Sequence, residues 1–377
     1  MSKTLQDYAT LINDTIQSNE INHYITTDNM CQNLGGIDTF KNINIPQGKV
    51  RSFQKDDVLL SNIRLYFRKV YRAKQKGGCS SDVLVFRAKH IDSATLFAIL
   101  SSQIFTDYAC SGSQGSKMPR GNKTHMMDFK IPTINFTIAK IFNSIQNKIE
   151  NNHKINELLH KILELLYEQY FVRFDFLDEN NKPYQTSGGK MKFSKELNRL
   201  IPSGWSVRFL NHKIVSTYQP KTISKTLLND SYSYSVYGGG GIIGGFTEYN
   251  HEQSEFIISC RGQCGISYLT LPKSWITGNA MVIRPTKSYT SKTYLYHTIN
   301  KYKLTNYITG SVQPQITRQN LSTMPILIPK RKTLNKWNNI SSLLWNLIHN
   351  NMQSTQTLTV LRDFLLPLLL KQQVKPQ

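Results

Sequence analysis

Basic side chains alternate with aromatic rings in residues 55–72 of this 377-residue chain. The stretch holds Lys55, Arg64, Arg68, Lys69 and Arg72, with Tyr66, Phe67 and Tyr71 among them. Lys and Arg neutralise phosphates, and an arginine can donate two hydrogen bonds to O6 and N7 of a guanine. The pattern predicts a nucleic-acid contact, although a solvated strand face would show the same composition. The candidate contacts in this half are Lys55, Asn62, Arg64, Arg68 and Arg72, then Lys117, Arg120 and Lys123 in a second basic loop.

The second half of the chain offers a matching set of polar side chains. These candidates are Ser259, Arg261, Gln263, Gln315, Arg318 and Asn320. Gln and Asn side chains suit bidentate hydrogen bonds to adenine. Arg120 and Arg318 align when the two halves are compared, so we expect both to contact the nucleic-acid backbone rather than to specify bases.

The two halves repeat one another at a nearly constant offset. Ser61, Gly112, Ser113, Arg120 and Asn122 recur 198 positions later, as Ser259, Gly310, Ser311, Arg318 and Asn320. The apolar run at 83–85 returns at 281–283, and Ile131-Pro132 returns as Ile328-Pro329. Outside such marks the halves look unrelated. A repeated scaffold whose two copies differ in their other residues predicts a protein that recognises two different targets.

The charge of the chain is strongly positive and unevenly placed. There are 46 Lys and Arg against 24 Asp and Glu, which gives a net charge of +22 and a pI near 9.7. Such an excess predicts a polyanionic partner, with nucleic acid the default, and a basic protein without a partner is the alternative. Residues 136–170 have no net charge and residues 336–370 only +1, so two neutral segments alternate with two basic ones.

The sequence predicts a cytoplasmic protein. Residues 1–20 are polar, which argues against a secretory signal. The longest strongly apolar run, residues 364–370, is far below the roughly 18 residues that a helix needs to cross a bilayer. The five cysteines are an odd number, which fits reduced thiols.

No motif predicts catalysis. Residues 238–245 contain a literal G-x-G-x-x-G, but no strand–helix–strand unit surrounds it, so we interpret it as a flexible loop near DNA or a sheet edge. Cys260 and Cys264 lack a second pair of ligands for zinc, and the histidines form no metal-binding motif. Neither an adenine-methyltransferase signature nor a nuclease-like arrangement of acids is evident. We therefore expect no catalytic residue and no metal or cofactor bound by this chain.

The two neutral segments predict two long helices. Apolar residues at heptad spacing mark the seam of the first helix: Ile141, Ile145, Ile155, Leu159, Ile162 and Leu166. The seam of the second consists of Ile340, Leu344, Leu347, Leu358, Leu361, Leu365 and Leu368. Such a narrow stripe is typical of helices that pair, although each helix could instead pack only on its own domain. Polar residues interrupt both seams near their middles and would meet in an antiparallel pair, and Pro367 should kink or end the second helix.

The basic segments predict two mixed α+β domains. Strands are expected near 57–60, 82–86, 255–258 and 280–283, and short helices near 93–105 and 290–302. The expected organisation is a first domain at 1–135, a helix at 136–170, a linker at 171–204, a second domain at 205–332 and a second helix at 333–377.

The order of these features resembles the specificity subunits of type I restriction–modification systems. Residues 24–30 with Gly35-Gly36-Ile37 look like the opening of a recognition domain in that family, and Ile201-Pro202-Ser203-Gly204-Trp205 like its usual start of the second domain. Residues 310–329 are similar to the family's passage from the second domain into its helix. The resemblance covers essentially the whole chain.

The resemblance implies two target recognition domains, each followed by a long helix, with the helices paired antiparallel as a coiled-coil spacer and the domains related by a pseudo-twofold axis. It implies an asymmetric, bipartite double-stranded DNA site, two methyltransferase subunits that modify adenine at N6, and nuclease/translocase subunits that join them in phage defence. S-adenosylmethionine, and ATP with Mg, would belong to those partners. The alternatives are the specificity subunit of a type IIB-like system, a free-standing DNA-binding regulator and a stand-alone enzyme.

Overall fold

The computed structural model describes residues 3–38, 43–131, 133–229, 232–262, 264–310 and 313–369. Contacts divide the chain into two compact units, the first formed by Met1–Lys154 with Met352–Gln377 and the second by Ile155–Asn351. Each unit therefore contains part of both long helices. Within the described ranges, no helix is long and apolar enough to cross a membrane.

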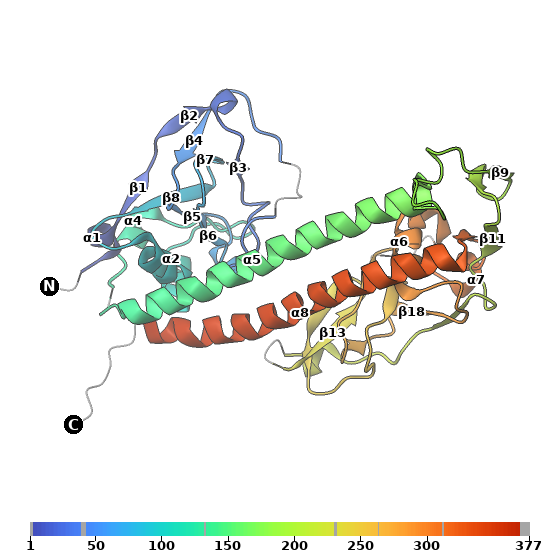
Figure 1. Cartoon of the computed structure of the whole chain (residues 1–377). Coiled ribbons are helices and arrows are strands. Elements are labelled where there is room, and N and C mark those ends of the chain that lie inside the picture. Colours follow the sequence, from blue (N-terminus) through green and yellow to red (C-terminus); the bar gives the residue numbers. More distant parts are fainter. Residues whose placement is uncertain are drawn as a thin grey trace. The chain divides into compact units, whose positions relative to one another are not determined.

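An antiparallel four-stranded sheet forms the centre of the first unit (Figure 1). Its strands in spatial order are β1 (Ala9–Ile12), β8 (Val83–Ala88), β5 (Val58–Ser61) and β6 (Val70–Arg72). Every residue of β5 is buried because both faces of the strand are covered. Val58 and Leu60 join the core that contains helix α2, while Leu59 joins a second core with Phe53, as the two-residue period of a strand requires.

A smaller sheet and four short helices complete this unit. The sheet has the order β2 (Thr15–Gln17), β4 (Lys49–Phe53), β7 (Gly77–Cys79) and β3 (Tyr24–Ile25). The helices are α1 (Leu5–Tyr8), α2 (Ser93–Ser101), α3 (Gln103–Ser111) and α4 (Lys123–Met127). The single helix expected at 93–105 is two helices, because the Ser102 side chain caps a new helix by accepting from the Phe105 amide at 3.2 Å.

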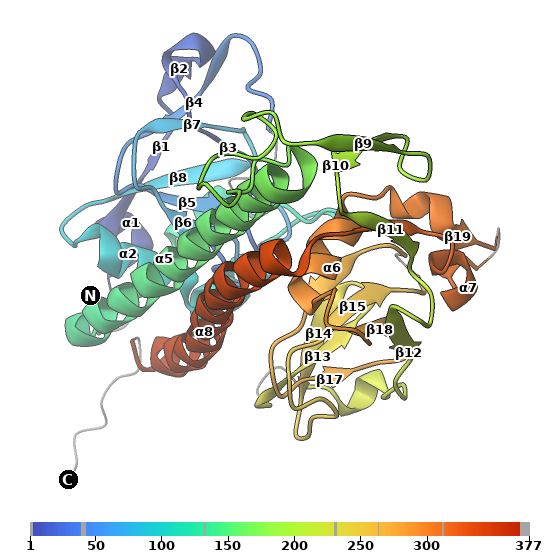
Figure 2. The same cartoon turned by 45° about the vertical axis from the view of Figure 1, so that its right-hand side comes forward.

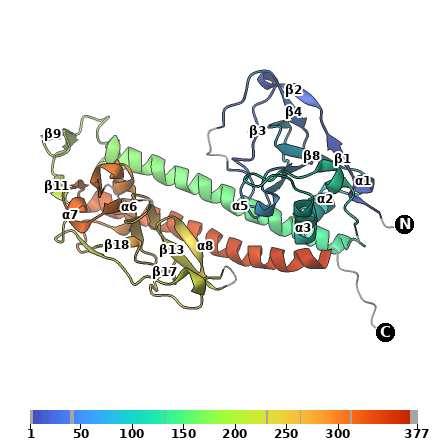
Figure 3. The same cartoon turned by 180° about the vertical axis from the view of Figure 1, so that it is seen from behind.

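The second unit is built on the same plan (Figure 2). Its central sheet has the order β12 (Val215–Tyr218), β18 (Ala280–Pro285), β15 (Phe256–Ser259) and β16 (Ser267–Leu269), and α6 (Lys292–Asn300) packs on it. A second sheet joins β14 (Gly241–Phe246), β13 (Tyr234–Gly238) and β17 (Trp275–Ile276), with β13 beside β17 as Figure 3 shows. The remaining pairs are β9 (Met191–Ser194) with β10 (Arg199–Pro202), β11 (Ser206–Phe209) with β21 (Pro325–Ile328), and β19 (Ile308–Thr309) with β20 (Gln315–Ile316).

The hydrogen bonds at the strand ends repeat as well. In the first unit the Asn62 amide donates to Asp82 O at 2.7 Å, and Asn62 O accepts from the Gly121 amide at 3.1 Å. In the second unit Cys260 takes the place of Asn62, donating to Asn279 O at 3.0 Å and accepting from the Ile316 amide at 3.1 Å. The internal repeat predicted from the sequence is therefore a repeat of backbone connections.

The two long helices are α5 (Phe136–Tyr167), which continues as a π-helical turn (Glu168–Val172), and α8 (Arg331–Leu369). The Asn135 side chain starts α5 by accepting from the Ile138 amide at 3.1 Å. In the first unit Gln146 of α5 lies against Arg362 of α8, and Asn152 against Thr355, so the residue numbers rise along one helix and fall along the other. The helices therefore run antiparallel there.

The same direction holds in the second unit, where the His160 ring of α5 lies against Trp345 of α8 and the Tyr167 ring against Trp337. Polar residues near the helix middles also meet there. Asn351 Nδ2 donates to Asn156 Oδ1 at 2.9 Å, and Asn156 Nδ2 donates to Ile348 O at 3.3 Å. The expected antiparallel pairing with matched polar midpoints is present in both units. The prediction that α8 ends at Pro367 is wrong, since the helix runs through it to Leu369, the last described residue, and the alternative kink stays a prediction.

The predicted seams are correct in period but wrong in phase. Ile145 is buried as expected, whereas Ile141, Ile155, Ile162, Leu347 and Leu361 each keep more than 40% of their surface exposed, and Leu159, Leu166, Leu344, Leu358 and Leu365 are only half-buried. The buried line on α5 runs instead through Ala139, Phe142, Ile149, Leu163 and Tyr167, and on α8 through Trp337, Trp345, Ile348, Arg362 and Leu366. A shift of one residue turns a side chain by about 100° around the helix axis, which moves a leucine from the seam to the surface.

Candidate nucleic-acid interface

The first unit brings its two basic loops together at the end of β5. Ile63 forms a β-bridge with Arg120, and the Arg64 amide donates to Pro119 O at 2.9 Å. The Arg64 guanidinium reaches Lys117 O at 3.5 Å and lies 6.0 Å from the centre of the Phe67 ring. The loops at 62–67 and 117–120, far apart in the sequence, therefore form one surface.

This surface is exposed and mostly cationic. Lys117 and Lys123 are exposed, and the Arg120 side chain is 63% exposed while its guanidinium donates to Asp82 at 3.0 Å. Tyr66 and Met118 keep 53% and 54% of their surface accessible. Cations next to a free aromatic ring can neutralise phosphates and pack on a sugar or base. Arg64, Lys117, Arg120 and Lys123 thus remain candidates for contact.

Three other candidates in this half lie apart from that surface. Lys55 is exposed, but in the turn between β4 and β5. Asn62 is buried, and its backbone holds the loop in place. The Arg72 side chain is only 14% exposed and faces Asp56 at 3.8 Å. Burial removes Asn62 and Arg72 from the candidate contacts, and Lys55 is separated from the loop surface.

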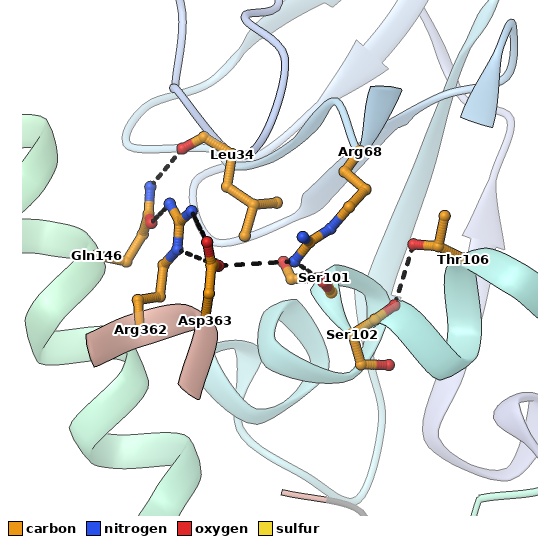
Figure 4. Close-up of polar contacts among 8 residues, drawn as sticks. All are labelled: Leu34, Arg68, Ser101, Ser102, Thr106, Gln146, Arg362 and Asp363. Atoms are coloured by element: carbon orange, nitrogen blue, oxygen red, sulfur yellow. Dashed lines mark hydrogen bonds and ion pairs between the residues drawn. The ribbon is translucent and has the colours of Figure 1, made fainter. Parts of the chain in front are cut away.

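Arg68 belongs to a buried polar network and not to the interface (Figure 4). Its guanidinium donates to Ser101 O at the end of α2 at 2.9 Å and lies 4.0 Å from Asp363 of α8. Asp363 pairs with the buried Arg362, which donates to Gln146 of α5 at 3.2 Å. Burial lowers the pKa of Arg68, and Asp363 opposes that shift. The network therefore ties α2, α5 and α8 together within the first unit.

The second unit presents its candidates from equivalent loops. Arg261 follows β15 and forms a β-bridge with Gln315, and both side chains are exposed. Ser259 is fully buried at the end of β15. The Asn320 side chain is engaged, since it donates to Tyr307 O at 3.0 Å and to Thr309 Oγ1 at 3.3 Å. Gln263 lies outside the described residues.

Arg318 is exposed at the first position of α7 (Arg318–Leu321), which the Thr317 side chain caps. It helps to line an open hollow of about 480 Å³ together with His212, Ser216, Thr217 and Gln319. Gln315, which is bridged to Arg261, lies three residues before Arg318 in the chain and does not line this hollow.

Arg120 and Arg318 do not occupy equivalent positions, although the sequences align them. The bridge that Arg120 makes with Ile63 is made in the second unit by Gln315 with Arg261. Asn122 caps α4 as Thr317 caps α7, so the structural offset in this loop is three residues shorter than the sequence offset. The equivalent exposed side chains are therefore Arg120 in one unit and Gln315 in the other, and the second unit can offer an adenine-type contact where the first offers a cation.

One repeated feature, an ion pair between neighbouring strands, was not predicted from the sequence. Arg87 and Asp57 pair at 2.8 Å in the first unit, and Arg284 and Glu255 pair at 2.7 Å in the second. Asp57 and Glu255 are 198 positions apart, so a search for conserved charge at the repeat offset would have found the pair.

The cysteines near the second loop show no metal-binding arrangement. Burial raises the pKa of both Cys260 and Cys264, which disfavours the thiolate form that a metal needs. Over the described part of the chain, no group of three or more His, Cys, Asp or Glu could hold a metal ion.

The fold as a whole is that of a solved specificity subunit. The crystal structure of a type I restriction–modification system S subunit from M. genitalium matches with a TM-score of 0.63 and 15% sequence identity, covering 99% of this chain and 96% of that one. At this identity the likeness establishes the fold.

Two sequence comparisons match the same kind of protein. A family model described as type I restriction modification DNA specificity domain matches residues 202–359. The type I restriction enzyme MjaIX specificity subunit of Methanocaldococcus jannaschii is 22% identical over 310 residues, which cover 72% of this chain and 67% of that protein. In sequence and in fold, the chain is therefore similar to type I restriction–modification specificity subunits.

Proposed function

We propose that this chain is the DNA-reading subunit of a type I restriction–modification complex and that each unit reads one half of an asymmetric, bipartite site. The most direct support is that both units contain the same pair of loops on an equivalent backbone, but with different exposed side chains. Ile63 and Arg120 are bridged in the first unit, and Arg261 and Gln315 in the second. Equivalent backbones with different side chains suit two different half-sites.

The long helices are proposed to hold two methyltransferase subunits, which restriction subunits can join. Large apolar side chains lie exposed on both helices, including Leu158, Leu165, Leu343, Val360 and Phe364, each at least 47% accessible. We assign these exposed apolar side chains to the contacts that the helices make with the partner subunits. S-adenosylmethionine, and ATP with Mg, would then belong to the partners, and this chain would position them without catalysing a step.

The test is to produce the chain with its methyltransferase subunit and to map methylated adenines in DNA from cells that carry both. The expected result is methylation at a split site with unread bases between two different half-sites. The proposed contacts are tested with the Arg261→Ala, Gln315→Ala double variant. It should lose or relax specificity for one half-site and keep specificity for the other. Methyl transfer or cleavage by the purified chain alone, or methylation at a single uninterrupted site, would contradict the proposal.

A further inference from the structure

A glycine-rich β-hairpin in the second unit ends in two exposed isoleucines. β13 and β14 pair antiparallel from Tyr234 with Phe246 to Gly238 with Gly241, so Gly239 and Gly240 form a two-residue turn. The stretch interpreted from the sequence as a flexible loop is thus a β-hairpin. Ile242 and Ile243 follow the turn and keep 47% and 39% of their surface exposed.

An irregularity in the strand pairing leaves the second isoleucine outside the regular ladder. Tyr237 pairs with Ile242 and Val236 pairs with Gly244, so Ile243 is the extra residue of a β-bulge. Bulges re-aim side chains and are common next to functional sites. A Cβ on Gly238 would lie 3.0 Å from Ile243 Cγ2, so the glycine leaves the room that this side chain occupies.

The turn of this hairpin lies against the candidate DNA loop. A Cβ on Gly239 would come within 2.9 Å of Arg261 O, and one on Gly241 within 3.3 Å of the Tyr268 hydroxyl. Only glycine permits this approach. The isoleucine pair therefore belongs to the same surface region as Arg261 and its bridge partner Gln315.

Two adjacent apolar side chains beside a cation fit one feature of duplex DNA. The major groove admits a two-stranded β-ribbon, and the thymine C5-methyl is the apolar group on its base edges. We propose that the β13–β14 tip enters the major groove and that Ile242 and Ile243 recognise thymine methyl groups in the half-site of the second unit, while Arg261 contacts the adjoining backbone. This inference rests on the proposed DNA-reading function.

Among the described residues of the first unit, the glycine pair Gly77-Gly78 is buried inside β7, and no glycine-rich hairpin with exposed isoleucines is present. The proposed methyl-reading contact therefore belongs to the half-site of the second unit.

The test uses the full chain in complex with its methyltransferase subunits and duplexes that carry the mapped site. Each thymine of the second unit's half-site is replaced in turn by deoxyuridine, which lacks only the methyl group. Burial of one methyl corresponds to about a fourfold change in affinity, so wild type should bind at least one uridine duplex about fourfold more weakly. No variant is needed for this measurement.

The Ile242→Ala, Ile243→Ala double variant should then bind the thymine and uridine duplexes equally well. Leu200→Ala is the control, because Leu200 is 55% exposed in the same unit but lies on β10. This variant should keep the uridine sensitivity of wild type. A wild-type complex that binds its site but ignores every uridine, or a double variant that remains uridine-sensitive, would overturn the inference. Absence of any site-specific binding would instead refute the proposed function.

Discussion

Arg87 and Asp57 form a two-pronged ion pair across β8 and β5, with Nε and one terminal nitrogen each 2.8 Å from a carboxylate oxygen. The second unit repeats the pair between Arg284 of β18 and Glu255, the residue before β15, but there both nitrogens donate to the same oxygen, Oε1, at 3.1 and 2.7 Å. The carboxylates differ in burial, since Asp57 is 2% exposed and Glu255 11%, and Arg284 is also the more exposed arginine. The repeat thus preserves a pair whose environment has diverged.

Replacing Asp57 with Asn should destabilise the first unit by about 2 kcal/mol, because a charge-assisted bond to a buried carboxylate is lost. Asp57 also accepts from the Gln54 amide at 2.8 Å. Glu255→Gln should cost less, about 1 kcal/mol, because water screens the more exposed arginine. Urea unfolding of the two variants measures the difference. Asp56→Asn is the matched control, since Asp56 is 52% exposed and its partner Arg72 is 3.8 Å away. Equal losses at Asp57 and Asp56 would contradict this account.

The phase of the helix seam can be tested with two adjacent residues of α5. Phe142 is fully buried and its ring lies 5.5 Å from that of Phe97 on α2, whereas Ile141 is 43% exposed. Phe142→Ala should therefore cost about 3 to 5 kcal/mol. Ile141→Ala should change the unfolding free energy by less than about 1 kcal/mol, as expected for a surface position. If Ile141→Ala lowered the unfolding free energy more than Phe142→Ala, the helix seam predicted from the sequence would be correct.

These two cases show which structural features can be predicted from sequence patterns and which cannot. The repeat, the central strands and the long antiparallel helices are predictable, because apolar periodicity and repeated residues report directly on burial. The seam phase is not, because α5 is apolar on more than one face, with Phe142 in the core and Leu158 57% exposed. Arg68 was placed in the interface for a similar reason. Composition shows a basic stretch, but only the fold reveals that this one guanidinium bonds Ser101 inside the first unit.

The structure separates arginines that should bind DNA from one that should not. Arg120→Ala and Arg261→Ala should each weaken DNA binding by the complex and reduce the slope of log affinity against log salt by about 0.9, provided that each contacts one phosphate. Arg68→Ala should leave that slope unchanged and instead lower stability, because it removes the bond to Ser101 and leaves Asp363 with fewer partners. Binding titrations over a range of salt, with parallel unfolding curves, check both effects. A loss of salt slope in Arg68→Ala without a loss of stability would return that residue to the interface.

Acid should weaken the second unit through two buried histidines, His297 of α6 and His349 of α8. Burial lowers the pKa of His297 to about 3, helped by repulsion from His160 and Lys301, and lowers the pKa of His349 to about 4, helped by Lys292 and His160. Both rings lie within 6.4 Å of the Trp345 ring in a closely packed aromatic cluster. The folded state thus holds them neutral, while an unfolded chain takes up protons below about pH 6.5.

The stability that these neutral rings contribute is complete above about pH 6.5 and is lost as the pH falls toward 4 and then 3. Each histidine should add a slope approaching about 1.4 kcal/mol per pH unit, so together they should cost about 4 kcal/mol at pH 5 relative to pH 7. Unfolding curves from pH 7 to pH 5 measure this slope. The His297→Gln, His349→Gln double variant should flatten it, whereas His212→Gln, at an exposed position, should not. A wild-type second unit that is equally stable at pH 7 and pH 5 would show that these rings are protonated without penalty in the folded protein.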